Sequence, residues 1–230
     1  GLGFNSWTQK FGRSAAAALK LVVGAKFQDN VNGSDRGAIF IFDVNDLTTS
    51  TKVICETDTS IYDFFSESVA VGDSKIFVGM PGADINGSGS GAVYIYNLDG
   101  TGETQVLASD GASGDQFGYA VDIGSNKIVV GALGDDDDGS ASGSAYVFNL
   151  DGTGQVKLTA SDAAAGDEFG SSVAVGGDKV YVGARYEDNA NGTNAGAFYV
   201  YNLDGTGEVK IINPENDDYA TFGYAMALGS

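Results

Sequence analysis

A pattern of about 53 residues repeats along this chain and constrains its fold more than any other feature. Each copy opens with Phe followed by Gly or Ser, then a short run of small residues, a tight turn and an apolar run. The opening residues are Phe11, Phe65, Phe117, Phe169 and Phe222, spaced by 54, 52, 52 and 53 residues. Such a period is typical of solenoids, propellers and arrays. We therefore expect one array over residues 1–230, with repeats at 11–64, 65–116, 117–168 and 169–221 and a partial fifth at 222–230.

Charge and residue usage narrow the classes of function. The chain has 31 acidic and 12 basic residues and a formal net charge of −19. Because binding to a phosphate backbone relies on clustered Lys and Arg, no nucleic-acid partner is expected. The absence of histidine removes Ser-His-Asp catalysis and the common zinc ligand sets. No apolar run approaches the roughly 20 residues of a membrane span. Cys55, the only cysteine, is expected to be a buried small apolar residue.

Each full repeat reads as four β-strands. In the third copy, small residues at 119–124 precede an almost wholly apolar run at 127–132, an apolar and aromatic run at 143–148, and an alternating run at 155–160. Continuous apolarity fits strands that are covered on both faces, whereas alternation suits an edge strand. Expected burial therefore falls from the middle strands to the fourth strand. This burial gradient predicts sheets that are arranged radially, with the first strand nearest a central axis. The fold class is therefore all-β, a β-propeller of four-stranded blades. First strands are expected near 12–18, 67–72, 119–124 and 171–176.

The turns between these strands are regular. First and second strands are joined by GDSK, GSNK or GGDK, which are tight hairpin sequences. Third and fourth strands are joined by NLDGTG, in which Asp-Gly is a strong hairpin signal. In the first repeat the corresponding stretch is DVNDLTTS, which we interpret as a longer loop.

Phe-Gly before the first strand and Gly-Ala after the second strand resemble the FG-GAP repeat. The similarity is greatest to the bacterial form with a short first hairpin, through LTASDAAAGDEFG from Leu158 and VLASDGASGDQFG from Val106. This resemblance implies the β-propeller of integrin α-chains and bacterial surface proteins, and an extracellular, cell-surface or virion-surface location. Ser66 departs from the pattern, because it replaces the expected Gly. The integrin-like calcium loop lies between the first two strands, and here that loop is too short and has too few carboxylates.

Acidic residues gather in the loops after strands two and four, which share one face if neighbouring strands are antiparallel. A pattern Asp-x-x-Asn/Asp-Gly recurs after strand two, for example at Asp29, Asn32 and Gly33. Hard cations such as Ca²⁺ bind carboxylate, amide and carbonyl oxygens. Asp and Asn also cap turns through their own backbone, and this alternative stays open. The candidate calcium ligands are Asp135, Asp136 and Asp138, followed by Asp29, Asp84 and Asp188.

Two functions compete. The leading one is a non-enzymatic extracellular recognition or adhesion module that presents these loops to a protein or glycan. The alternative is a structural repeat segment of a fibre, surface appendage or virion protein. Catalysis is not expected, because the acidic residues recur with each repeat and lie in similar environments.

Phe11-Gly12 and Phe222-Gly223 both open a first strand, so the two ends duplicate rather than complement each other. We therefore expect a larger parent chain, or a neighbouring subunit in a homo-oligomer, to supply the missing partner.

Overall fold

The computed structural model describes residues 15–17, 20–29, 36–57, 63–72, 74–215 and 217–228. Within these ranges the chain forms sixteen β-strands in four four-stranded sheets and no helix, which confirms the all-β prediction. Accordingly, no described segment is a helix long and apolar enough to cross a membrane. Phe11, Gly12, Asn32 and Gly33, which entered the sequence predictions, lie outside the described residues.

Each sheet uses four consecutive strands in chain order, and every pairing is antiparallel. The strands are β1 (Ala15–Ala17), β2 (Lys20–Ala25), β3 (Ala38–Asp43), β4 (Asp46–Val53), β5 (Ser68–Val71), β6 (Lys75–Met80), β7 (Ala92–Asn97), β8 (Thr104–Val106), β9 (Ala120–Gly124), β10 (Lys127–Ala132), β11 (Ser144–Asn149), β12 (Val156–Leu158), β13 (Phe169–Gly176), β14 (Lys179–Ala184), β15 (Ala197–Asn202) and β16 (Val209–Ile212). The four first strands lie at or close to their predicted positions.

The turns follow the local sequence, with one correction. Gly124 pairs with Lys127, so the β9–β10 turn consists of Ser125 and Asn126 at φ 52° and 58°, as a type I′ hairpin requires. The longer loop expected in the first repeat is wrong. There Asp43 pairs with Asp46, which leaves a turn of two residues, and β4 extends over eight residues. β-Branched Thr residues at 48, 49 and 51 favour the extended strand.

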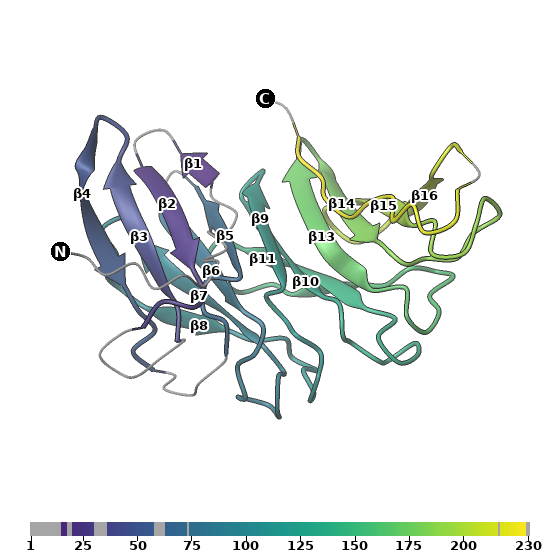
Figure 1. The fold of residues 1–230 in the computed structure, drawn as a ribbon, viewed down its shortest axis with the longest axis horizontal. Helices are drawn as coiled ribbons and strands as arrows, with labels where there is room; N and C mark the ends of the chain where they lie inside the picture. Colours follow the sequence, from purple (N-terminus) through teal and green to yellow (C-terminus); the bar gives the residue numbers. More distant parts are fainter. Residues whose placement is uncertain are drawn as a thin grey trace.

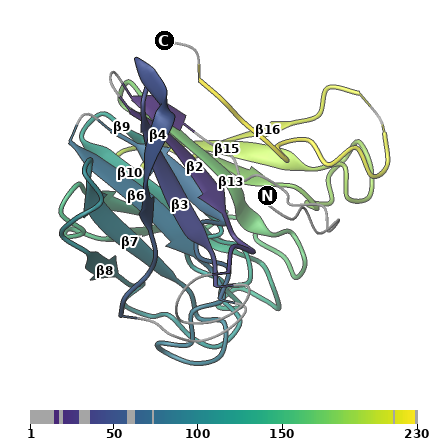
Figure 2. The ribbon, with the colours of Figure 1, turned by 60° about the vertical axis from the view of Figure 1, so that its left-hand side comes forward.

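The hydrophobic core lies between the sheets. Neighbouring sheets pack through their first strands, β1 against β5, β5 against β9 and β9 against β13 (Figure 1, Figure 2). Between the second and third sheets, for example, Val93 and Ile95 belong to the same buried cluster as Tyr146 and Phe148. The middle strands of the second and third sheets are therefore covered on both faces, and the fourth strands form outer edges, as the burial gradient predicted. Figure 1 shows the sheets as an arc with β4 and β16 at opposite ends.

A Phe-Gly pair, which we call a Phe-Gly lock, joins the third sheet to the second. The backbone N–H of Phe117 donates to the carbonyl of Ser90 in the loop after β6 at 3.1 Å. Its ring packs edge-on against Tyr146 and Phe148 of the next sheet, at centroid distances of 5.4 and 5.9 Å. Gly118 has φ +94°, and a Cβ there would lie 2.5 Å from a backbone oxygen. Phe thus fills the space between sheets, and Gly permits close backbone approach.

The partial fifth copy does not form its expected first strand. Phe222 pairs with Gly196 in an isolated parallel bridge, as Phe117 and Phe169 do with their own partners. Residues 224–228 then continue without strand structure. In the other sheets the second strand holds the first one by hydrogen bonds, and residues 224–228 have no such neighbour among the described residues.

Candidate functional site on the loop face

The loops after strands two and four lie on one face, as antiparallel pairing predicts. Backbone hydrogen bonds join them within each unit, for example from Gly114 N to Ser88 O and from Gly166 N to Ser140 O, both 2.9 Å. In the second to fourth sheets these loops comprise residues 81–91, 107–117, 133–143, 159–168, 185–196 and 213–222, and we call them the loop face.

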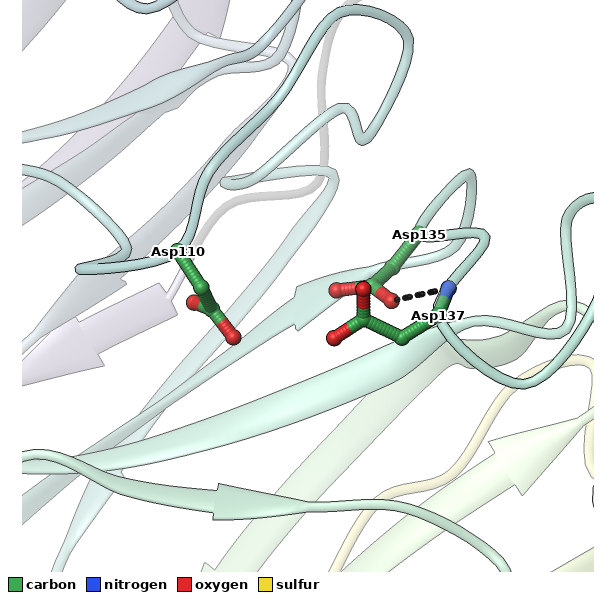
Figure 3. A group of neighbouring side chains, drawn as sticks. All are labelled: Asp110, Asp135 and Asp137. Carbon is green, nitrogen blue, oxygen red and sulfur yellow. Dashed lines mark hydrogen bonds between the residues drawn. The ribbon is translucent and has the colours of Figure 1, made fainter.

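A lysine lies at the centre of the acidic cluster in the third sheet. Lys157 on β12 places its Nζ 2.8 Å from Asp110, 2.9 Å from Asp135 and 2.6 Å from Asp137. The three carboxylates come from two loops and converge on one space (Figure 3). Each offers an oxygen within 4.8 Å of the others. Asp135 is 3% exposed, whereas Asp110 and Asp137 lie at the surface. The cluster is therefore a cation site that the chain fills with its own ammonium group.

Tyr146 completes this arrangement from the neighbouring strand. It pairs with Lys157 across β11 and β12, so both side chains project from the same face of the sheet. Its hydroxyl oxygen lies 2.9 Å from a carboxylate oxygen of Asp135 and 3.1 Å from one of Asp110, so its single proton is shared between the two acceptors. Burial would lower the pKa of Lys157, but hydrogen bonds to the three carboxylates outweigh it and raise that pKa above its ordinary value. Lys157 therefore remains a cation at any physiological pH.

The fourth sheet carries a second copy with different residues. Lys210 on β16 lies 2.7 Å from Asp162 and is also ion-paired with Glu187, which occupies the loop position of Asp135. The hydroxyl of Tyr199 donates to Asp162 at 2.8 Å. In the second sheet, Gln105 replaces the lysine and donates to the hydroxyl of Tyr94 at 2.8 Å. Ala83 replaces the buried acid there, so the lysine and its buried carboxylate are lost together.

Two further buried carboxylates organise the loops after strand four. Asp115 accepts a hydrogen bond from the backbone N–H of Ala112 at 2.7 Å, and Asp167 accepts one from Ala164 at 2.9 Å. Burial raises the pKa of Asp167 to about 6, with a further contribution from the nearby charge of Glu187. Burial raises the pKa of Asp115 as well. Both carboxylates close turns, and part of Asp167 is protonated at mildly acidic pH.

Aromatic side chains surround Arg185 in the loop after β14. The guanidinium carbon lies 5.7, 4.9 and 5.6 Å from the ring centroids of Tyr119, Tyr186 and Tyr224. Glu168 forms an ion pair with the same guanidinium at 2.5 Å. Tyr186 and Tyr224 are 36% and 51% exposed. This group, which we call the tyrosine–arginine cluster, presents aromatic surface and hydrogen-bonding groups together.

The comparisons with known proteins settle the family. The model of the FG-GAP repeat matches residues 48–96, 101–148 and 153–201, which together make up well over half of the chain. The chain belongs to the FG-GAP repeat family. No curated protein matches it. Each FG-GAP match starts in or just before the fourth strand of one sheet and ends in the third strand of the next, so the sequence repeat bridges two sheets.

The predicted calcium ligands of this FG-GAP chain fall into separate environments. Asp135 joins the lysine cluster, whereas Asp136 and Asp138 are exposed beside it. Asp84 accepts from Gly89 N at 2.7 Å, and Asp188 accepts from Asn194 N at 2.6 Å, which is the turn-capping role left open by the sequence. Asp29 is exposed. The structure therefore brings together Asp110, Asp135 and Asp137, whereas the sequence analysis grouped Asp135 with Asp136 and Asp138.

Sequence reasoning missed Asp110, Asp137 and Lys157 as members of one site. A signal was present, because the fourth strands of the third and fourth repeats both read Val-Lys at equivalent positions. Of the first hairpins, the one between β9 and β10 differs from the integrin-like calcium loop. The β9–β10 connection has two turn residues, Ser125 and Asn126, and neither carries a carboxylate.

Proposed function

We propose that this chain is a non-enzymatic extracellular recognition or adhesion module that binds a protein or glycan through its loop face. FG-GAP repeats occur in adhesion and other extracellular proteins and typically serve recognition or structural roles. The observation that carries the proposal is the tyrosine–arginine cluster, which exposes Tyr186 and Tyr224 around the ion-paired Arg185. Tyr and Arg are enriched among the residues that dominate binding energy at interfaces.

The scaffold beneath this cluster supports a preformed surface. The Phe-Gly locks and the loop-to-loop hydrogen bonds hold the loops against a buried core. A surface that is ordered before binding loses less conformational entropy when it meets its partner. The acidic clusters add directionality, because their carboxylates accept hydrogen bonds and favour partners with basic or hydroxyl groups.

Binding of the labelled chain to a glycan array and to an array of purified extracellular matrix proteins tests this proposal. We expect a bound partner whose affinity falls at least about tenfold in the Tyr186→Ala, Tyr224→Ala double variant, because two exposed aromatic contacts are removed. The matched control is Val44→Ala, which alters an equally exposed side chain in the β3–β4 turn away from the loop face. Equal loss in the control, or no binding to either array, would count against a recognition role.

We further propose that Ca²⁺ binds the loop face at Asp110, Asp135 and Asp137. The oxygen ligands suit a hard cation, but the ammonium of Lys157 lies among them. Calcium must therefore compete with the ammonium group of Lys157, which is covalently part of the chain. We expect the wild-type chain to bind calcium weakly for this reason. An ion there would bridge the loop after β8 to the loop after β10.

The alternative proposal, a structural repeat segment of a fibre, surface appendage or virion protein, has one observation in its favour. Apolar side chains of β2 and β3 line an open groove on the first sheet. Exposed apolar surface of this kind is typical of sites that contact another protein. Filaments seen by negative-stain electron microscopy at high protein concentration would favour this role over soluble recognition.

A further inference from the structure

The molecule forms the same sheet-to-sheet interface three times. In each one, the β3-type strand of the earlier sheet contributes small or branched residues, such as Val93 and Ile95. The corresponding strand of the later sheet contributes two aromatic residues, such as Tyr146 and Phe148. We call the face of a sheet that packs against the following sheet its trailing face, and the face that packs against the preceding sheet its leading face. Every internal interface pairs one trailing face with one leading face.

In the part of the chain that the structure describes, no sheet covers the leading face of the first sheet. Leu21, Val23, Phe40 and Phe42 occupy the positions that are almost fully buried in the other sheets, yet all four are only partly buried. Together with Leu47 and neighbouring residues they line a groove of about 620 Å³. Their counterparts Ile76, Val78, Tyr94 and Tyr96 in the second sheet are at most 2% exposed.

Among the described residues, no sheet covers the trailing face of the fourth sheet either. Phe198 and Val200 are partly buried, and Val209 on the adjacent β16 is 53% exposed. Their counterparts Val93 and Ile95 are 1% and 3% exposed.

Phe222 extends this trailing face. Its ring packs against Phe198 of the preceding sheet at 5.6 Å. Phe117, by contrast, packs against two rings on the leading face of the following sheet, Tyr146 and Phe148. The first sheet carries Phe40 and Phe42 at the positions of those two rings, on its open leading face.

We propose that a second copy of this chain covers these surfaces, with Phe222 and the trailing face of one copy against the leading face of the other. The occupant follows from the interface itself, because the two open faces are the two halves of a contact that the chain already makes internally. Each copy carries one of each half, so the contact is head-to-tail. A head-to-tail contact of this kind repeats either into a closed ring or into an open filament.

The net charge of −19 opposes association at long range. Salt screens that repulsion without weakening apolar contact, so association should strengthen as ionic strength rises. A contact dominated by surface ion pairs would show the reverse dependence.

Sedimentation-velocity centrifugation from high nanomolar to high micromolar concentration measures this association. We expect the wild-type chain to dimerise or to form larger species. Phe42→Asp on the leading face and Val200→Asp on the trailing face should each weaken association about thirtyfold or more, because each places a charge in the apolar contact. The more exposed Leu47→Asp and Val209→Asp should have the same effect with less risk to folding. Val44→Asp, outside the groove, is the matched control.

Mixing the two variants gives the decisive result. The Phe42→Asp chain keeps an intact trailing face and the Val200→Asp chain keeps an intact leading face, so the mixture should form heterodimers that neither forms alone. An interface between identical patches predicts no such rescue. A wild-type chain that stays monomeric throughout, or variants that associate as the wild type does, would overturn the proposal.

Discussion

The ammonium nitrogen of Lys157 lies 2.9 Å from the carboxylate of Asp135, which is 3% exposed. A buried carboxylate without a partner carries a large desolvation cost, and Lys157 removes that cost while Tyr146 satisfies a second acceptor position. The buried carboxylate of this acidic loop is therefore already paired with a lysine of the same chain. Any metal at this position has to displace the lysine, which makes the lysine the natural residue to change.

Lys157→Met should destabilise the chain by about 3–5 kcal/mol, because Asp135 loses its cation while remaining buried. Ca²⁺ should then restore stability, by about 2.7 kcal/mol at a hundredfold excess over its dissociation constant. Thermal unfolding with millimolar Ca²⁺ and with a chelator measures both effects. In the control Lys127→Met, the lysine lost is bonded to the neutral side chain of Asn149 at 2.7 Å, so calcium should change its stability no more than that of the wild type. Identical melting curves for Lys157→Met with and without calcium would exclude the cluster as a cation site.

Asp167 gives a pH dependence whose sign follows from its raised pKa. In the unfolded chain its pKa lies near 3.8, and in the folded chain it is about 6. The folded state therefore binds the proton more tightly, and the stability this group contributes is fully present below 3.8 and lost as pH rises through 6. Asp167→Asn keeps the oxygen that accepts from Ala164 N and should remove this slope. We expect the melting temperature of the wild type, relative to the variant, to rise as pH falls through that window.

Asp204 supplies the opposite sign as an internal control. The hydroxyl and backbone N–H of Thr206 donate to its carboxylate at 2.7 and 3.0 Å and hold its pKa below 3.8. Its stabilising contribution is present above 3.8 and is lost as pH falls through the lower folded value. The wild type loses this contribution in acid and Asp204→Asn does not. The melting temperature of the wild type, relative to that of Asp204→Asn, should therefore fall as pH falls. If both variants changed the pH profile in the same direction, the assignment of Asp167 would be wrong.

The strands were predictable because their signal is local, whereas the cluster was not. Residues 128–132 are apolar without interruption, and that alone indicates a strand covered on both faces. The Lys157–Asp110 contact joins residues 47 positions apart, from different sheets, and depends on how one sheet packs on the next.

Residues 43–53 show where the local sequence signal was misleading. The Asp and Asn residues of DVNDLTTS suggest a long loop, but only Val44 and Asn45 form the turn, because the Thr-rich segment after them prefers the extended strand.

Ser66 occupies a position that favours glycine, and replacing it should stabilise the chain. Its φ is +74°, its side chain is fully buried, and its hydroxyl oxygen makes no hydrogen bond with the described residues. Ser66→Gly removes both the strained backbone and the buried unpaired hydroxyl, so we expect a gain of about 1–2 kcal/mol. The reverse change, Gly118→Ser, should destabilise, because its Cβ would lie 2.5 Å from the carbonyl oxygen of Ala92. Urea unfolding of both variants measures the two effects, and a loss of stability in Ser66→Gly would refute the strain argument.

The Phe-Gly locks should differ in strength according to whether a following sheet encloses the ring. Phe117 is fully buried between two sheets, so Phe117→Ala should cost about 3–5 kcal/mol. Phe222 makes the same backbone contact to the loop before it, through its N–H to Ala195 O at 2.8 Å, but its ring is only partly buried. Phe222→Ala should therefore cost about 1 kcal/mol or less in the monomer. Denaturant unfolding in dilute solution compares the two variants. Equal losses would mean that the backbone bridge, and not enclosure of the ring, supplies the stability of the lock.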